Sequence, residues 1–367
     1  MLTRESNILL TGATGLIGGE LLRGLLARGI HRVWTLVRAE GELAPGQRLS
    51  RRLACGRPAP ELNGCLERAL PGDMAAERLG LPRPAESALQ QQVDIILHCA
   101  ADTSFLGRRC RRTNVEGMQH LIDFASGCGR DPLVVYLGTA ATCGAVEHRC
   151  LTEEEGCNLE AAHHNEYTRS KAEAERMLRQ SGLRHLIVRP SVVLSTGLAD
   201  PELAATLLWF MPLLNEFEAV PIDARARMDV VPVGWVADSV LRLLAVSPRR
   251  YRCYHLSAGA TAAPTWGEIC AYLDEYYRRP AGLKLIPPPD WTRAVQKQYI
   301  RTPRQRLIFS RLRYYLPFIN MDVVYDNGRL REELGGDAAR LPRALSCLTE
   351  LLPLIDLEEA LAASRSP

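Results

Sequence analysis

The stretch Thr11-Gly12-Ala13-Thr14-Gly15-Leu16-Ile17-Gly18 lies between a short apolar strand and a helix. Its glycines have the spacing G-x-x-G-x-x-G. Glycine lets a backbone turn sharply and approach a pyrophosphate, and the third glycine lets the helix pack closely on the strand. The helix N-terminus that follows offers N–H groups to an anion. The stretch therefore predicts a dinucleotide-binding turn, with a tight β–α turn that binds nothing as the alternative.

Strands and helices alternate beyond this turn. We expect strands at residues 7–11, 33–37, 65–70, 93–98, 133–137 and 186–188, and helices at residues 16–28, 113–126 and 165–180. The strands are apolar along their whole length, which indicates a parallel sheet that is covered on both faces. The predicted fold class is therefore α/β, a Rossmann-type doubly wound parallel sheet.

The pattern changes after Pro190. Strand-like pieces at 229–233 and 254–257 are separated by helical stretches and by proline-rich turns. We expect a Rossmann domain over residues 1–192, with segments of about 222–258 returning to it. Residues 193–221 and 259–367 are then expected to form a smaller, mostly helical lobe that binds the substrate.

The composition is that of a globular protein. Of 367 residues, 47% are apolar and 24% are charged, and the net charge of +3 is too small to indicate a nucleic-acid partner. Eleven cysteines form no C-x-x-C pair. We therefore expect reduced thiols in a cytoplasm and no metal site. We also expect no signal peptide and no transmembrane segment, because the longest apolar run, residues 203–214, is too short to span a bilayer.

Arg38 stands at the end of the second expected strand. Folds that bind NAD usually place Asp or Glu there, to hold the ribose 2′-hydroxyl. A guanidinium cannot accept from that hydroxyl, but it can bind a 2′-phosphate through two hydrogen bonds. The sequence therefore predicts NADP(H), and NAD held by Glu40 or Glu42 is the alternative. Asp73, which ends the third strand, is a candidate for the adenine edge or for a helix N-cap.

Tyr167 and Lys171 form a Y-x-x-x-K pair within the helix expected over residues 165–180. Residues at i and i+4 share a helical face, so the phenol and the ammonium point the same way. Hydride chemistry at a carbonyl needs a proton donor for the developing alkoxide. A nearby ammonium and an oxidised nicotinamide lower the pKa of a phenol. The pair therefore predicts a catalytic site, and a surface aromatic–cation pair is the alternative.

Two further polar residues follow the fourth and fifth strands. Thr139 lies just beyond the carboxyl end of the fifth strand, where ligands bind in open α/β sheets. Its hydroxyl could hold the substrate oxygen beside Tyr167, and Thr142 is a competing choice. Asn114 is expected to begin the next helix, where it either caps the helix or holds a water or backbone group near Lys171.

These motifs resemble those of the extended short-chain dehydrogenase/reductase superfamily over residues 7 to about 260. The resemblance rests on segments 11–18, 98–101, 113–117, 167–171 and 189–191, and on Thr139. The branch that looks nearest is the fatty acyl-CoA reductase and thioester reductase branch with its male-sterility-type NAD(P)-binding domain. Segments 36–38, 71–74 and 101–105 resemble that branch, and segments 315–318 and 324–327 do so more loosely.

The resemblance implies Thr139, Tyr167 and Lys171 as catalytic residues, with Pro190 and Ser191 near the nicotinamide. The complete set of residues expected to bind the cofactor is Gly12, Thr14, Gly15, Leu16, Ile17, Gly18, Arg38, Asp73, Met74, Cys99, Ala100, Ala101, Asn114, Lys171, Pro190, Ser191 and Val193.

A thioester reductase transfers hydride from NADPH to an acyl thioester carbon and releases a thiol and an aldehyde, which a second reduction converts to an alcohol. A carbonyl reductase, a hydroxysteroid-type dehydrogenase and a nucleotide-sugar epimerase or dehydratase of the same superfamily are alternatives. Ala140 and Ala141 replace the Asp-Glu pair that is typical of the sugar dehydratases, which argues against elimination chemistry. A third hypothesis is an NADP(H)-sensing regulator without turnover, against which Tyr167 and Lys171 argue.

Two arginine clusters are candidate sites for CoA or an acyl carrier protein, because both partners are anionic. The first is Arg108-Arg109-Cys110-Arg111-Arg112. The second contains Arg301, Arg304, Arg306, Arg311 and Arg313, interleaved with Leu307, Ile308, Phe309 and Leu312. A solvated helix face is the alternative for both clusters, and the second could also rest on a membrane surface. The sequence leaves the oligomeric state open.

Overall fold

The computed structural model describes residues 1–38, 41–53, 63–104, 109–195 and 210–336, together with residues 345, 348 and 352. Within this described part, no helix is long and apolar enough to cross a membrane.

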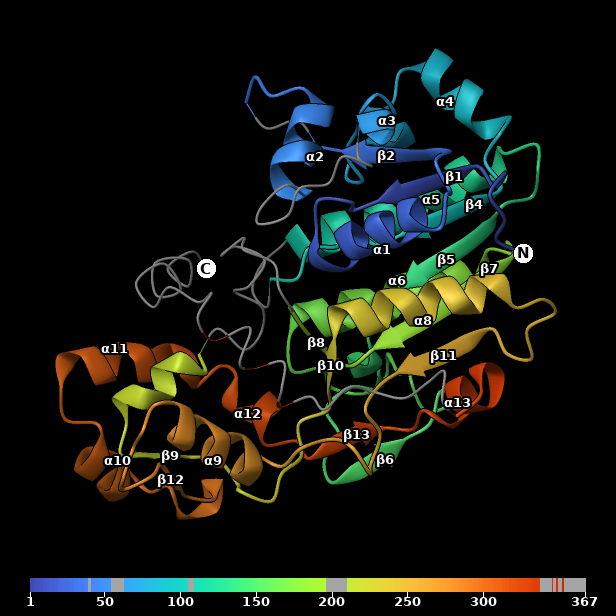
Figure 1. The fold of residues 1–367 in the computed structure, drawn as a ribbon. Helices are drawn as coiled ribbons and strands as arrows, with labels where there is room; N and C mark the ends of the chain where they lie inside the picture. Colours follow the sequence, from blue (N-terminus) through green and yellow to red (C-terminus); the bar gives the residue numbers. More distant parts are fainter. Residues whose placement is uncertain are drawn as a thin grey trace.

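A seven-stranded parallel sheet forms the centre of the molecule (Figure 1). The strand order is β11-β7-β5-β4-β1-β2-β3, so the chain winds outward in both directions from the β1–β4 pair. The strands are β1 Ile8–Thr11, β2 Val33–Val37, β3 Ala69–Pro71, β4 Ile95–His98, β5 Leu133–Leu137, β7 His185–Pro190 and β11 Cys253–Leu256. This arrangement confirms the predicted Rossmann-type α/β fold.

Helices cover both faces of the sheet (Figure 1). On one face, α1 (Leu16–Ala27) packs with α8 (Val233–Ala245) over strand residues such as Leu10. On the other face, α5 (Gly117–Ser126) and α6 (Glu166–Gln180) pack over the alternate strand residues. Successive side chains of a strand point to opposite faces, so two covered faces require strands that are apolar throughout.

The shorter elements of the sheet domain connect these layers. They are α2 Pro45–Leu53, α3 Asn63–Leu66, η2 Glu77–Gly80, α4 Arg83–Gln90, the π-helical η3 Arg111–Glu116, η4 Ala140–Cys143, β6 Arg149–Leu151, β8 Val192–Leu194 and β10 Val230–Pro232. β8 and β10 form a separate parallel pair at the carboxyl end of β7.

The second part of the chain forms a mostly helical lobe with its own apolar core (Figure 1). Trp266 is fully buried in this core, and its Nε1 donates to the Ile319 carbonyl at 3.0 Å. The elements are η5 Pro212–Glu216, β9 Ala219–Val220, α9 Trp266–Tyr276, β12 Lys284–Leu285, η6 Pro288–Asp290, α10 Arg293–Tyr299, α11 Pro303–Leu312 and α12 Leu316–Ile319. A lobe of this kind after the parallel sheet agrees with the expected fold class.

The chain then returns to the sheet domain, which the sequence did not indicate. β13 (Val323–Tyr325) pairs in parallel with β6, and α13 (Gly328–Leu334) lies against β11 and α8. Leu330 of α13 is fully buried in the same core as α1 and α8. This segment was expected in the substrate lobe, and the division into two domains otherwise stays a prediction.

Two local expectations were wrong. Residues 65–70 were expected as a strand, but α3 ends at Leu66 and β3 begins only at Ala69. A short apolar run does not by itself distinguish a strand from a helix. Asn114 was expected to begin a helix, but it lies inside η3, whose N-cap is Cys110.

Candidate active site

The glycine turn brings β1 and α1 closer together than any side chain would allow. Gly12 has a φ of +74°, and a Cβ there would lie 2.5 Å from the Ala100 nitrogen. A Cβ on Gly18 would collide with the Gly12 carbonyl oxygen. The Gly15 nitrogen donates to that same oxygen at 2.9 Å and closes the turn. Local geometry therefore requires glycine at positions 12 and 18, and the backbone itself forms the surface of the turn.

The N-terminus of α1 is suited to an anion. Its N-cap is Gly15, no side chain caps it, and no acidic residue lies in its first turn. Thr14, Leu16 and Ile17 are partly exposed beside it. The first N–H groups of a helix have no acceptor within the helix, and the helix dipole favours negative charge at this end. A pyrophosphate is the kind of ligand that this turn fits.

Lys171 is held inside the protein by α6. Asn165 caps this helix by accepting from the Thr168 nitrogen at 2.9 Å. Lys171 is 2% exposed, and its Nζ donates to the Leu137 carbonyl at the end of β5 at 2.7 Å. The Nζ also lies 4.3 Å from the centre of the Tyr136 ring. The ammonium therefore sits beneath the carboxyl end of β5.

Tyr167 and Thr139 meet at this end of β5. Thr139 is 9% exposed, and its side chain forms a hydrogen bond with Tyr167. Its Oγ1 also accepts from the Ala141 nitrogen at 3.3 Å. The competing residue, Thr142, is fully buried; its Oγ1 donates to the Thr139 carbonyl at 3.2 Å and accepts from the Cys157 nitrogen. Of the two threonines, Thr139 is thus the one that contacts the phenol.

The ionisation of Tyr167 differs from the expectation. Burial raises the pKa of Tyr167 to about 12, with only partial opposition from the hydrogen bond with Thr139. Burial lowers the pKa of Lys171 to about 7. The predicted lowering of the phenol pKa by Lys171 is therefore not produced by the protein's own groups, because the ammonium is directed at Leu137 and Tyr136. The phenol keeps its proton at neutral pH.

Asn114 connects two parts of the site. Its Nδ2 donates to the Ser170 hydroxyl at 2.9 Å and to the Asp102 carbonyl at 3.0 Å, and its Oδ1 accepts from the Asp102 nitrogen at 2.8 Å. Since Ser170 precedes Lys171 on α6, Asn114 ties the loop after β4 to the helix that carries Tyr167 and Lys171. Two roles were expected for Asn114. It does not cap a helix, but it does hold a backbone segment near Lys171.

Other expected cofactor residues line the same carboxyl edge of the sheet. Cys99, Ala100 and Ala101 follow β4 and are partly exposed, and the Ala100 nitrogen donates to the Thr11 hydroxyl at 3.3 Å. After β7, Pro190 and Ser191 are buried, whereas Val193 is half-buried. The strands β1, β4, β5 and β7 are parallel neighbours, so these residues meet the glycine turn at one edge.

The residues expected at the adenosine end lie farther out along β2 and β3. Arg38 is exposed just beyond β2, and Arg48 of α2 donates to its carbonyl at 2.5 Å. Asp73 is not a helix cap; its carboxylate accepts from the Ala75 nitrogen at 3.0 Å and forms a turn. Met74 is 4% exposed within the core beside α5, and its carbonyl oxygen lies 2.9 Å from His120 Nδ1.

The structure describes only some of the residues expected as alternative contacts for NAD and of the first arginine cluster. Glu40 and Arg108 lie outside the described residues, and Glu42 is exposed. In the first cluster, both Nη atoms of Arg111 donate to Glu173, at 3.0 and 3.1 Å. Arg109 and Arg112 are exposed.

The second arginine cluster lies on and beside α11. Three of its apolar residues face the core of the lobe, while Leu307 is 42% exposed. Arg304 Nε lies 3.1 Å from a Glu216 carboxylate oxygen, and an Arg301 nitrogen lies 3.7 Å from Glu218. Because the apolar side of α11 is directed inward, the cluster has little apolar surface for a membrane.

Two residues that the sequence analysis missed lie behind the site. Glu175 and Arg189 are both fully buried and bind one another. The available signals were an arginine inside the apolar strand β7 and a glutamate one helical turn beyond Lys171. Such charges are rarely buried unless they are paired.

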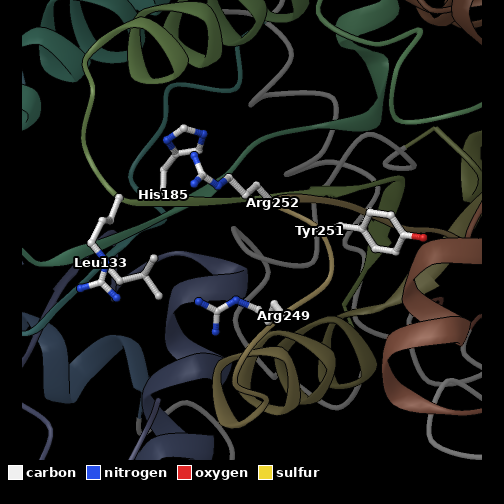
Figure 2. Close-up of a pocket in the computed structure, with 6 residues that line it drawn as sticks. Leu133, His185, Arg249, Tyr251 and Arg252 are labelled. Atoms are coloured by element: carbon white, nitrogen blue, oxygen red, sulfur yellow. The ribbon is translucent and has the colours of Figure 1, made fainter.

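A small basic pocket of about 150 Å³ lies at the opposite, amino edge of the sheet (Figure 2). Leu133 begins β5 and His185 begins β7, so the pocket is at the far end of the strands from Tyr167. The lining residues are Leu133, Arg184, His185, Arg249, Tyr251 and Arg252. This pocket is therefore separate from the candidate active site. Among the described residues there is also no group of His, Cys, Asp and Glu that could hold a metal ion.

Curated proteins similar to this chain are mostly longer than it. Fatty acyl-CoA reductase 1 of Xenopus laevis is 25% identical over 317 residues, which cover 74% of this chain and 62% of that protein. A linear gramicidin synthase of Brevibacillus parabrevis is 30% identical over 249 residues, which cover 64% of this chain and 5% of that protein. The chain thus spans less than two thirds of the length of these relatives.

A solved structure with the same fold is the terminal R domain from the myxalamid PKS-NRPS biosynthetic pathway. It has a TM-score of 0.78 at 23% identity, over 96% of this chain and 91% of the R domain. Residues 10–240 match the model of the NAD-binding family described as male sterility protein, a range that contains the glycine turn, Thr139, Tyr167 and Lys171. The chain therefore belongs to the male sterility protein family of NAD-binding domains, within the extended short-chain dehydrogenase/reductase superfamily of oxidoreductases.

Proposed function

We propose that this chain is an NADPH-dependent reductase that converts an acyl thioester to an aldehyde or an alcohol. The observation that carries the proposal is the hydrogen bond between Thr139 and Tyr167, above the buried Lys171 and on the sheet edge of the glycine turn. Two hydroxyls that converge beside a dinucleotide turn can hold one carbonyl oxygen while its carbon accepts a hydride.

The dinucleotide would lie across the carboxyl edge of the sheet. The turn Gly12–Gly18 and the N-terminus of α1 would bind its pyrophosphate, and Pro190 and Ser191 would lie beside its nicotinamide. When bound in its reduced form, the cofactor supplies a hydride. The other residues proposed for its binding are Thr14, Leu16, Ile17, Arg38, Asp73, Met74, Cys99, Ala100, Ala101, Asn114, Lys171 and Val193.

The protonation state of Tyr167 fits the reductive direction. With its pKa raised to about 12 by burial, the phenol is protonated at neutral pH and can donate to a developing oxyanion. Thr139 donates a second hydrogen bond to the same oxygen. The carbon–sulfur bond then breaks, the carbonyl re-forms as an aldehyde and returns its proton to Tyr167, and the thiolate leaves and takes up a proton from water. A second hydride and the Tyr167 proton would reduce the aldehyde to an alcohol.

The names of the relatives support a thioester substrate. The fatty acyl-CoA reductase that matches this chain is named for an acyl-CoA, and the other relative is named as a gramicidin synthase. Ala140 and Ala141 lie in η4 with 1% and 9% exposure and carry only methyl groups, so they provide no acid or base for sugar dehydration. An anionic carrier, CoA or a carrier protein, could approach the exposed Arg109 and Arg112 near the site.

Turnover should separate the thioester proposal from its nearest alternative. We expect NADPH oxidation with acyl-CoA or acyl-carrier-protein substrates, measured by the loss of NADPH absorbance, and no turnover in the Lys171→Met variant. A panel that also contains aldehydes and ketones provides the comparison. Turnover with simple aldehydes or ketones alone would replace the thioester reductase with a carbonyl reductase.

Cofactor choice should depend on Arg38. We expect Arg38→Asp to weaken NADPH binding by about 10- to 100-fold, because a charge-assisted hydrogen bond to phosphate contributes roughly 1.5–3 kcal/mol, and to leave NADH binding nearly unchanged. Arg48, whose guanidinium reaches the Arg38 carbonyl at 2.5 Å, brings a second positive charge to this place. Titration of both cofactors by fluorescence measures the effect. Equal losses for NADPH and NADH would show that Arg38 does not contact the 2′-phosphate.

A further inference from the structure

A fully buried ion pair lies directly behind the candidate active site. Arg189 on β7 donates from Nε and Nη2 to the two carboxylate oxygens of Glu175 on α6, at 2.9 and 2.7 Å. The side chains are 1% and 0% exposed. A two-point contact of this kind fixes the carboxylate in both position and direction. Arg179, one turn further along α6 and 38% exposed, also donates from Nε to a Glu175 carboxylate oxygen at 2.9 Å. The proposed reaction uses neither residue directly.

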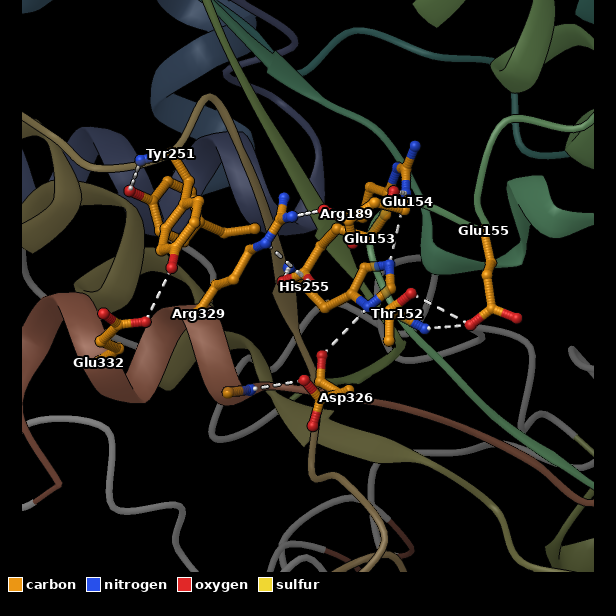
Figure 3. A network of polar contacts seen from close by, with 12 residues as sticks. Thr152, Glu153, Glu154, Glu155, Arg189, Tyr251, His255, Asp326, Arg329 and Glu332 are labelled. Carbon is orange, nitrogen blue, oxygen red and sulfur yellow. Dashed lines mark hydrogen bonds and ion pairs between the residues drawn. The ribbon is translucent and has the colours of Figure 1, made fainter.

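The arginine itself is held from its other side (Figure 3). Its Nη1 donates to the Glu153 carbonyl at 2.9 Å and lies 3.4 Å from His255 Nε2. Nδ1 of His255 lies 3.1 Å from the Asp326 carbonyl oxygen. In the tautomer that carries its proton on Nδ1, the ring donates a hydrogen bond to this oxygen. Burial lowers the pKa of His255 to about 3, so the ring is neutral and its Nε2 can accept from Arg189. The carboxylate of Glu175 is therefore anchored to a rigid part of the sheet domain.

Glu175 shares a helical face with the catalytic pair. Tyr167, Lys171 and Glu175 follow one another at intervals of four residues on α6, which places them on one side of the helix. We propose that Glu175, fixed by Arg189 on the buried face of α6, is the anion that keeps Lys171 in its ammonium form. Glu175 would then be a positioning residue that acts through Lys171.

The surroundings of Lys171 offer hydrogen bonds but little compensating charge. From β5, the Leu137 carbonyl accepts from Nζ and the Tyr136 ring faces it, and both groups are uncharged. Four titratable groups interact electrostatically with Lys171. They are His98 and Cys99 at the end of β4, Cys110 at the start of η3, and Glu175 on α6.

Glu175 alone among these groups is an anion at neutral pH. Burial raises the pKa of Cys99 to about 12 and that of Cys110 to about 11, so both are neutral thiols. Burial lowers the pKa of His98 to about 3, so its ring is neutral as well. Although burial opposes it, the hydrogen bonds and charges of Arg189 and, to a smaller extent, Arg179 hold the pKa of Glu175 below its ordinary value. The carboxylate therefore stays charged.

Because Lys171 is buried, its protonation depends on the negative charge of Glu175. Burial lowers the pKa of Lys171 to about 7, and the charge of Glu175 works against that effect. Loss of the anion would leave a neutral amine at the pH of the cell. The consequence for turnover rests on the proposed reductase function, but the charge of Lys171 can be measured without any substrate.

The test is an NMR titration of the lysine side chains in the full chain. Isotope-labelled lysine gives very few signals, from Lys171, Lys284 and Lys297, and the Lys171→Met variant assigns the first. We expect Glu175→Gln to lower the pKa of Lys171 by about one unit or more, as loss of a nearby opposite charge does. Lys284 and Lys297 are exposed, and their titration should not change.

Two further variants make the result decisive. Glu173→Gln removes the same charge from the same helix, where Glu173 faces Arg111, and should leave the Lys171 titration unchanged. Glu175→Leu/Arg189→Leu replaces the pair by apolar side chains, a change that folded proteins often tolerate, and should give the same downward shift if Glu175→Gln unfolds. A Lys171 titration in the folded variants that matches the wild type would overturn the proposal, whatever the substrate of the enzyme is.

Discussion

Tyr167→Phe is expected to reduce NADPH-dependent turnover by about 10²- to 10⁴-fold, the range for loss of a general acid. The substitution removes one oxygen, which forms the hydrogen bond with Thr139 and carries the proton for the substrate oxygen. The ring remains, so the packing of α6 should be preserved. Because Tyr167 is not part of the glycine turn, the affinity for NADPH should fall far less than the rate.

Single-turnover NADPH oxidation and a separate binding titration measure the two effects. Tyr276→Phe removes the same oxygen from a tyrosine that is 39% exposed on α9 and should turn over at the wild-type rate. Thr139→Ser keeps a hydroxyl beside Tyr167 and should retain more activity than Thr139→Val. A Tyr167→Phe enzyme with the wild-type rate would show that the phenol is not the proton donor.

The parts of the site that sequence reasoning reached are those in which a few neighbouring residues determine the geometry. The glycine turn spans eight residues, and contacts within the turn or with the adjoining end of β4 require glycine at positions 12 and 18. Tyr167 and Lys171 lie one helical turn apart, so their common face follows from the helix alone. The parallel sheet likewise follows from strands that are apolar on both faces.

The parts that sequence reasoning missed depend on contacts between distant elements. Glu175 and Arg189 meet only because α6 packs on β7 with one particular rotation. Lys171 donates to the Leu137 carbonyl. Because any residue at position 137 would supply this carbonyl, the pattern of side chains could not predict the contact. Asn114 lies in a π-helical turn, a rare geometry that the expected helix start did not allow for.

Position along the chain also gave a wrong expectation for one segment, which was assigned to the substrate lobe. The segment that carries β13 and α13 follows the substrate lobe in sequence but packs on the sheet domain. Its contribution is a single short strand and a helix of seven residues, Gly328–Leu334. Elements this short have too weak a periodicity to show which core they join. The pairing of β13 with β6 and the burial of Leu330 beside α1 and α8 reveal it.

Arg189→Leu is expected to lower the free energy of unfolding by about 3–5 kcal/mol at neutral pH, which is the usual cost of removing one partner of a buried ion pair. The carboxylate of Glu175 would remain buried in the same place without the two hydrogen bonds from Arg189, and of its cationic contacts the one from Arg179, which is 38% exposed, would remain at Oε1. Urea unfolding followed by circular dichroism gives the difference. The exposed pair Arg28–Asp238 provides the control, since Arg28→Leu should change the free energy by no more than about 1 kcal/mol.

The pH dependence of this loss follows from the sign of the pKa shift. In the wild type, the pKa of Glu175 is held below its ordinary value of 4.5, so the pair stabilises the fold above that pH and stops doing so as the pH falls. In Arg189→Leu, we expect burial to outweigh the remaining contact with the partly exposed Arg179 and to raise the pKa of Glu175, so the variant regains stability when acid protonates the carboxylate. The difference between the two proteins should therefore be largest at neutral pH and should shrink towards pH 4.

In Glu175→Leu/Arg189→Leu, both charges are absent and the loss should be small at every pH. A loss in Arg189→Leu that is the same at neutral and acid pH would mean that missing packing, and not the lost partner of a buried carboxylate, destabilises the variant.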